Sequence, residues 1–154
     1  SSYIKGPLIN FLVKKKAINI HMGISPFYRG TDCNFWALYD GNPHLVGATI
    51  HFLSKGLDNG QIIYHAISNH KNNEFEYTMS AAKSAFHSIV EKIKNNSLYK
   101  MKKVTQDSKF EIRYSKKIDF NDYIIKKFYK KNLKINREFD LSKLTNPFIL
   151  YNKK

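Results

Sequence analysis

Residues 17–30 read AINIHMGISPFYRG, an alternating segment followed by a stretch rich in residues that break regular structure. The alternation predicts a β-strand that turns Asn19 and His21 to one face and its isoleucines to the other. Glycine, serine and proline interrupt the remainder, Met22 to Gly30, so we expect a loop there. Ligands of α/β proteins bind at the carboxyl ends of strands, and these two polar side chains therefore mark a candidate site.

The residues on either side of this segment predict an α/β fold. Strands are predicted over residues 46–53, 61–67 and 109–114, and helices over residues 31–40, 76–94 and 120–133, with a helix ending within 8–13 and an extended tail over 141–154. In the longest helix, the apolar side chains expected to form the packing face are Met79, Ala82, Phe86, Ile89, Val90 and Ile93. The 109–114 strand would turn Phe110, Ile112 and Tyr114 to one face.

Composition narrows the classes of protein that the chain could represent. Its 154 residues suit one domain, and no stretch has the apolar length of a membrane span. The net charge of +14 would attract anions, but only three of the 26 basic residues are arginines, which does not favour a dedicated nucleic-acid partner. The single cysteine, Cys33, excludes an internal disulfide framework and a cysteine-based metal cluster. A reducing, cytoplasmic location is the default expectation.

A second candidate position lies in the glycine-bracketed turn Ser54–Gly60, which carries Asp58. Acids in such turns usually bond the turn's own backbone, but a carboxylate held near a histidine can assist proton transfer. His21 can exchange a proton near neutral pH, and Asn19 could donate an amide N–H to an oxygen that gains negative charge. His51, just before the turn, is a candidate support for Asp58 or His21. The alternative is that all four are hydrogen-bonded structural residues.

Four motifs resemble, in order and spacing, those of the folate-dependent formyltransferases. They are Asn19-Ile20-His21, Ser25-Pro26-Phe27-Tyr28-Arg29-Gly30, Gly47-Ala48-Thr49-Ile50-His51 and Leu57-Asp58-Asn59-Gly60-Gln61-Ile62-Ile63. The family includes glycinamide ribonucleotide formyltransferase, methionyl-tRNA formyltransferase and the nucleotide-sugar N-formyltransferases. The resemblance implies an α/β fold, namely the carboxy-terminal part of a Rossmann-like formyltransferase sheet flanked by helices.

The resemblance also implies a reaction, the transfer of a formyl group from 10-formyltetrahydrofolate to a primary amine without a metal or a covalent nucleophile. Asn19, His21 and Asp58 match the family's catalytic triad, in which the first two stabilise an oxyanion and the carboxylate relays a proton. Other matching positions are Tyr28, Arg29 and Gly30 for substrate binding, Thr49 and His51 for support, and Leu57, Asp58 and Gly60 for binding the folate cosubstrate.

This chain departs from the family's pattern in two ways. Met22-Gly23 replaces the Pro-Ser that often follows the histidine, so the loop geometry should differ. Family members also carry a substantial amino-terminal half before this strand, whereas this chain starts shortly before it. We therefore expect residues 1–118 to form a partial catalytic region and residues 119–154 to form a basic helix and an extended tail. Whether this chain is active alone stays open.

Several acceptors and one other class of function stay open. The Asn34-Phe35-Trp36 helix and the basic segment from Asp119 resemble the nucleotide-sugar N-formyltransferases, whose acceptor is a nucleotide-linked amino sugar. A methionyl-tRNA or glycinamide ribonucleotide formyltransferase relative is an alternative, as is a non-catalytic basic remnant that binds nucleic acid or a partner subunit. A homodimer is a candidate assembly, and no membrane partner is expected.

Overall fold

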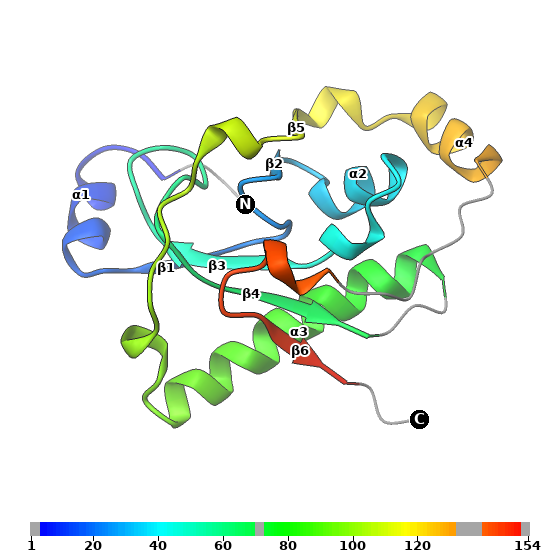
Figure 1. Cartoon of the computed structure of the whole chain (residues 1–154). Helices are drawn as coiled ribbons and strands as arrows, with labels where there is room; N and C mark the ends of the chain where they lie inside the picture. The colour runs from blue at the N-terminus through cyan, green and yellow to red at the C-terminus, as the bar shows by residue number, and fades with distance from the viewer. Residues whose placement is uncertain (1–3, 70–72, 132–139, 152–154) are drawn as a thin grey trace.

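A mixed β-sheet with helices on both faces forms the centre of the computed structural model, which describes residues 4–69, 73–131 and 140–151 (Figure 1). The strands are β1 (Ile18–His21), β2 (Tyr28–Gly30), β3 (Ala48–Phe52), β4 (Ile62–Ser68), β5 (Arg113–Ser115) and β6 (Phe148–Leu150). The α-helices are α1 (Pro7–Lys14), α2 (Cys33–Tyr39), α3 (Glu74–Lys94) and α4 (Asp122–Lys130). The predicted α/β sheet flanked by helices is confirmed.

The main sheet has the strand order β1-β3-β4-β6. The pairs β1–β3 and β3–β4 are antiparallel, whereas β6 runs parallel to β4. The predicted tail thus contributes a strand to the same sheet as β1, and the proposed division after residue 118 stays a prediction. Among the helices in the described ranges, none combines the length and apolar content needed to span a bilayer.

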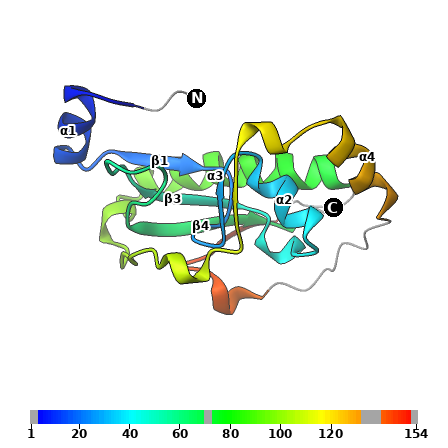
Figure 2. The same ribbon diagram turned by 90° about the horizontal axis from the view of Figure 1, so that it is seen from above.

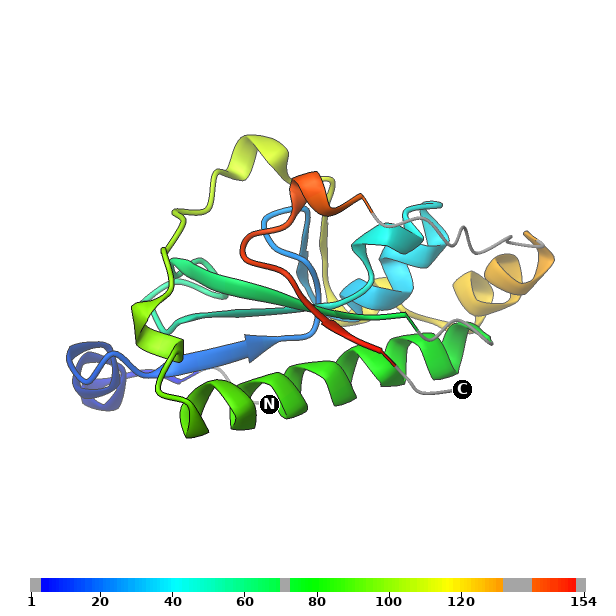
Figure 3. The ribbon, with the colours of Figure 1, turned by 60° about the horizontal axis from the view of Figure 1, so that its bottom comes forward.

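The register of the sheet places several polar side chains in one row across three strands. Asn19 lies opposite His51, His21 opposite Thr49, and Thr49 opposite His65. Residues directly opposite one another point to the same face of a sheet. The strand pairing therefore gathers three histidines on one face, and the helix α3 covers the other face (Figure 3).

The helix α3 confirms the predicted helix but not its predicted packing face. The side chains that it buries are mostly small: Tyr77, Ser80, Ala81, Ser84, Ala85 and Ser88. Small residues let the helix approach the sheet closely, and the Ser84 hydroxyl is satisfied by the Ile67 carbonyl at 2.6 Å. The larger side chains form what we call the outer face of α3, which consists of Phe75, Met79, Phe86, Val90 and Ile93. These are 49–72% exposed, so the prediction was wrong for Met79, Phe86, Val90 and Ile93, whereas Ile89 packs against the core as predicted.

Two other predicted segments differ from the structure. The predicted loop over 22–30 ends in β2, which pairs in parallel with β5. In place of the predicted strand over 109–114, the structure has a 3-10 turn over Ser108–Phe110, which is followed by β5. The turn forms because the Asp107 side chain accepts a hydrogen bond from the Lys109 N–H and so caps it. The three side chains expected to share a packed face, Phe110, Ile112 and Tyr114, are all exposed.

Beside α2, an ion pair and a cation–π contact hold the second sheet, which consists of β2 and β5. Asp40 accepts hydrogen bonds from Arg113 Nε at 2.9 Å and Arg113 Nη2 at 2.6 Å, a bidentate geometry that is favourable for this pair. The same guanidinium lies over the Trp36 ring, 4.4 Å from its centroid. By contrast, α1 buries none of its side chains and stands at one end of the molecule (Figure 2).

Candidate active site

Asn19, His21 and Asp58 lie in direct contact, although about forty residues of sequence separate them. Asn19 Nδ2 donates a hydrogen bond to Asp58 Oδ1 at 2.9 Å, and His21 Nδ1 lies 3.3 Å from Asp58 Oδ2. The two β1 residues point to one face as predicted, and the turn after β3 carries the carboxylate across to them. The structure therefore brings together the three residues that the sequence singled out.

The turn that carries Asp58 is held tightly against the end of β3. Gln106 Nε2 donates to the carbonyls of Asp58 and Gly60, both at 2.8 Å. A Cβ atom added at Gly60 would lie 1.7 Å from the Phe52 carbonyl oxygen, so only glycine fits there. Asp58 itself has a φ of 47°, a left-handed conformation that aspartate tolerates better than most residues. The carboxylate is thus fixed by its backbone as well as by its partners.

His21 and Asp58 form a buried imidazolium–carboxylate pair. Burial alone would lower the pKa of His21, but its hydrogen bonds to Asp58 and Cys33 raise that pKa to about 10. Burial likewise opposes charge on Asp58, but the hydrogen bond with His21 holds the pKa of this carboxyl well below its usual range. His21 Nε2 donates to the Tyr28 carbonyl at 3.0 Å. At neutral pH the ring therefore carries a proton on each nitrogen.

This pair predicts how stability should depend on pH. The folded-state pKa of His21 exceeds its ordinary value of 6.5, so its stabilisation is complete below pH 6.5 and is lost as the pH rises toward 10. The stabilisation from Asp58 is present above 3.8 and lost at lower pH. We expect the free energy of unfolding to fall above pH 6.5, by up to about 1.4 kcal/mol per pH unit.

Denaturant titrations at several pH values, on the unmodified chain and on Asp58→Asn, measure this contribution. The difference between the two proteins should shrink between pH 6.5 and 10, because only the unmodified chain has the pair to lose. A difference that stays constant over this range would contradict the ion pair.

The two other histidines of the row are each held through both ring nitrogens. His51 Nδ1 donates to the Phe52 carbonyl at 2.8 Å, and its Nε2 lies 3.2 Å from Asn19 Nδ2. In His65, Nδ1 accepts from the Thr145 N–H and Nε2 donates to the Ser25 carbonyl, both at 3.0 Å. Burial lowers the pKa of His65 to about 4.

His65 is the residue of this row that the sequence reasoning missed. It lies in the middle of a buried strand and connects that strand to the loop after β1 and to the chain before β6. The position of His65 opposite Thr49 could have indicated this residue, but that position is known only once the strand register is known.

Thr49, predicted as a support, accepts a hydrogen bond from the Ser25 N–H at 2.8 Å and donates one to the Gly23 carbonyl at 2.6 Å.

Gly23 stands where the family often has serine, and the structure gives a reason for the difference. A Cβ atom at this position would lie 2.5 Å from Cys33 Cβ and 2.8 Å from His21 Nε2. Cys33 is buried at the start of α2, so this side chain occupies the space that a residue larger than glycine would need. In this chain, the packing of Cys33 and His21 against Gly23 therefore requires glycine at this position.

The residues predicted to bind substrate have different surroundings. Tyr28 is buried, and its hydroxyl accepts from Asn42 Nδ2 at 2.8 Å, facing α2 rather than Asp58. Arg29 reaches the site: Nη2 donates to the Leu57 carbonyl at 2.9 Å and Nη1 to Glu111 at 3.1 Å, while its buried Nε has no hydrogen-bond partner among the described residues. The roles of these residues in binding stay predictions.

Gly30 and Leu57 complete the set of predicted binding positions. Gly30 was expected to let the backbone come close to the substrate. In the structure it lets the backbone come close to β5, because a Cβ atom added at Gly30 would lie 1.9 Å from the Ser115 carbonyl oxygen. The Leu57 side chain is 42% exposed beside Asp58. An exposed apolar side chain next to a fixed carboxylate is compatible with the flat ring of a folate, but this binding role also stays a prediction.

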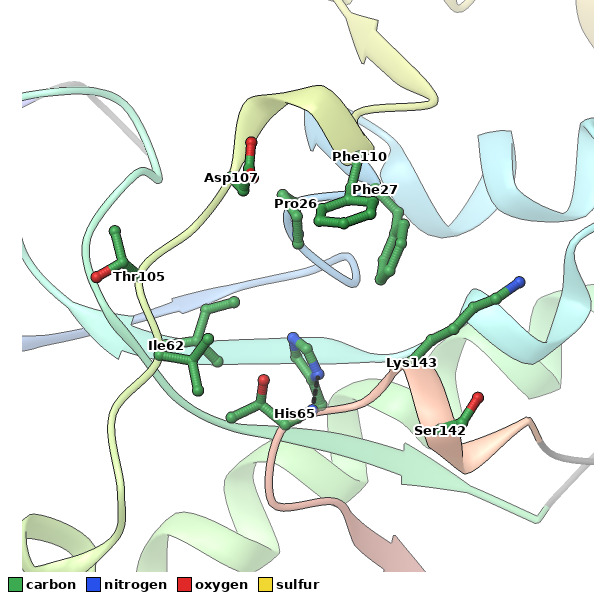
Figure 4. Close-up of a pocket in the computed structure, with 11 residues that line it drawn as sticks. Pro26, Phe27, Ile62, His65, Thr105, Asp107, Phe110, Ser142 and Lys143 are labelled. Atoms are coloured by element: carbon green, nitrogen blue, oxygen red, sulfur yellow. Dashed lines mark hydrogen bonds between the residues drawn. The ribbon is translucent and has the colours of Figure 1, made fainter.

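A cavity of about 370 Å³ lies on the same face of the sheet, beyond the loop after β1 (Figure 4). Phe27 and Phe110 line one side of it, with ring centroids 6.5 Å apart, and His65 lies at its floor. Neither Asn19 nor Asp58 lines this cavity. Within the described ranges, no group of three or more His, Cys, Asp or Glu side chains is arranged to hold a metal ion, and the expected independence from metal stays a prediction.

Fold and site together define an α/β protein in which strand β1 and the turn after β3 bring an amide, an imidazolium and a carboxylate together. Residues 4–94 match the family model described as formyl transferase, and the chain belongs to that family. The resemblance found in the sequence motifs is therefore confirmed.

Methionyl-tRNA formyltransferases are among the curated proteins similar in sequence to this chain. The one from Desulforamulus reducens is 38% identical over 52 residues, covering 34% of this chain and 16% of that protein. The one from Prochlorococcus marinus is 28% identical over 120 residues, covering 73% of this chain and 36% of that protein. The chain thus spans about a third or less of the length of these relatives.

A solved structure similar to this chain is that of the formyltransferase PseJ from Anoxybacillus kamchatkensis. It was determined in complex with UDP-4,6-dideoxy-4-formamido-L-AltNAc and tetrahydrofolate. The TM-score is 0.57 at 25% identity, and the match covers 94% of this chain and 72% of PseJ. The match extends beyond the residues of the family model and so includes most of the described fold.

Proposed function

We propose that this chain contributes the catalytic side chains for formyl transfer from 10-formyltetrahydrofolate to the amine of a nucleotide-linked amino sugar. The contact of Asp58 with both Asn19 and His21 carries the proposal, because it places a carboxylate and a doubly protonated imidazole at one point. The formamido sugar nucleotide bound by PseJ supports the choice of acceptor class.

The raised pKa of His21 decides the role of this side chain. An imidazolium with a pKa near 10 is a poor base at neutral pH, but its positive charge stabilises an oxygen nearby that becomes negative. Such an oxygen forms when the amine attacks the formyl carbon. His21 therefore stabilises the charge that develops during the reaction, and Asp58 keeps His21 protonated.

Asp58 receives the proton that leaves the attacking amine. Because its pKa is held well below the usual range, it does not retain that proton and passes it on through water. The folate supplies the formyl carbon and, as the bond to that carbon breaks, a nitrogen that takes up a proton. Leu57 and the turn around Asp58 would hold the folate beside these groups.

The activity test uses the natural protein that contains this chain, with 10-formyltetrahydrofolate and a UDP-linked amino sugar. We expect release of tetrahydrofolate that depends on the acceptor, together with a sugar nucleotide heavier by one carbonyl group. A parallel reaction replaces the sugar amine by a hydroxyl as the matched control. Equal release of tetrahydrofolate in both reactions would argue against amine formylation.

Methionyl-tRNA is a second candidate acceptor, because the curated relatives are methionyl-tRNA formyltransferases and the chain carries a net charge of +14. The same assay with initiator methionyl-tRNA separates the two acceptors. Binding of RNA that weakens steeply with added salt, without formylation of either acceptor, would instead favour a basic binding module. The expected homodimer stays a prediction.

A further inference from the structure

The outer face of α3 is a continuous apolar stripe on the side of the helix away from the sheet (Figure 3). Its five members follow one another at steps of three, four or seven residues, so they line up along one side of a helix that is about 30 Å long. Exposed apolar side chains that are contiguous in this way are typical of a surface that binds another protein.

The apolar positions of α3 are arranged symmetrically about the midpoint of the helix, Ser84. Phe75 and Ile93 lie at equal distances before and after it, and so do Ala82 and Phe86. A second copy of α3 that runs antiparallel to the first therefore brings Phe75 opposite Ile93 of the other copy. It also places the large Phe86 ring over the small Ala82, so the stripe is complementary in shape to itself.

The charges of α3 select the same antiparallel direction. Its first turn is acidic, with Glu74 and Glu76, and its last turn is basic, with Lys92 and Lys94. Two antiparallel copies bring an acidic end close to a basic end at both ends of the contact, whereas two parallel copies would bring like charges together. Each favourable contact occurs twice, because a two-fold axis relates the copies.

We propose that two copies of this chain associate through the outer faces of α3, with the two helices antiparallel about a two-fold axis near Ser84. Covering the stripe on both copies buries on the order of 1,000 Å², close to the lower limit for a specific interface. The row of histidines lies on the opposite face of the sheet, so both candidate active sites stay open. This inference does not depend on the proposed function.

Sedimentation of the natural protein that contains this chain measures the association. The net charge of +14 opposes the approach of two copies, so the experiment uses about 0.15 M salt, at which charge repulsion extends only about 8 Å. We expect a dimer at a protein concentration of roughly 100 µM, since interfaces near the lower size limit are weak. A protein that stays monomeric under these conditions would overturn the proposal.

Phe86→Glu tests whether the outer face of α3 forms the contact. Phe86 lies near the centre of the stripe, is 61% exposed and occurs twice in the dimer, so its loss should raise the dimer Kd by about a hundredfold or more. Tyr123→Glu is the matched control, because Tyr123 is an exposed aromatic residue on another helix, α4, and its substitution should leave the Kd unchanged. Equal Kd values for the two variants would refute the interface.

A pair of charge variants tests the direction of the helices. Glu76→Lys alone and Lys94→Glu alone each place like charges together at both ends, so each should raise the dimer Kd by about tenfold. In an equimolar mixture of the two variants, unlike charges meet again at both ends, and the Kd should return to that of the unmodified protein. This recovery also shows that both variants are folded.

A parallel pair of helices gives a different result. The unmodified protein would then already have like charges at both ends, so neither single variant would weaken the dimer, and the proposal would be wrong. Formyl transfer is a separate measurement, because Phe86→Glu should leave kcat/KM unchanged. Absence of turnover in a dimeric protein would therefore count against the proposed function and not against this interface.

Discussion

Asp58→Asn is expected to reduce kcat/KM for formyl transfer by about a thousandfold or more, while the folded structure survives. Asparagine has nearly the same shape, so the hydrogen bond from Asn19 Nδ2 can persist. What is lost is the negative charge. Without it, burial lowers the pKa of His21, and the ring no longer carries the charge that stabilises an oxyanion. One substitution therefore removes both the proton acceptor and the positive charge on His21.

Steady-state kinetics together with a thermal unfolding curve test this expectation. Asp140→Asn is a suitable control, because Asp140 is a partly exposed aspartate that pairs with Lys143 at 3.6 Å, far from β1 in sequence and in a different segment. The control should retain normal kcat/KM. If Asp58→Asn kept a rate within a few-fold of the unmodified protein, the carboxylate would have no part in proton transfer.

Gly30→Ala is expected to destabilise the folded state by about 3 kcal/mol, the sum of a steric overlap and a backbone penalty. The added Cβ would meet Ser115 O at 1.9 Å, and this oxygen belongs to the backbone of β5, which cannot swing aside as a side chain can. Gly30 also has a φ of 94°, a conformation that alanine adopts with strain. The pairing of β2 with β5 should open.

Gly41→Ala separates these two contributions. Gly41 has a similar φ of 80°, but an added Cβ there meets nothing within 4 Å. It should therefore lose only about 1 kcal/mol, the conformational part alone. Denaturant unfolding of both variants gives the comparison. Equal losses would mean that β5 yields to the methyl group and that the close approach is not what requires glycine at position 30.

The elements of this fold were predictable where the sequence carries a local signal. Alternation located β1, and glycines located the turn with Asp58. The packing of α3 was not predictable in this way, because its apolar periodicity marks the exposed side. The face against the sheet is built mostly from serines and alanines, and the serine hydroxyls donate to nearby backbone carbonyls. Hydrophobicity alone cannot reveal a contact that depends on small size.

The candidate site was predictable in its residues but not in its protonation. The spacing of the motifs identified Asn19, His21 and Asp58, and the structure places them in contact. The neutral His65 is held by the Ser25 carbonyl and the Thr145 N–H, which come from distant parts of the chain. Such partners are set by the strand register and by tertiary packing, which no local pattern encodes.

The outer face of α3 also bears on how this chain should behave at high concentration. Lysines around it keep molecules apart at low ionic strength, since the net charge is +14. Added salt shortens the range of that repulsion to about 10 Å at 0.1 M and leaves the phenylalanine, valine and isoleucine side chains free to adhere to one another. The colloidal stability of the isolated chain should therefore decrease with salt, opposite to the salting-in that many proteins show.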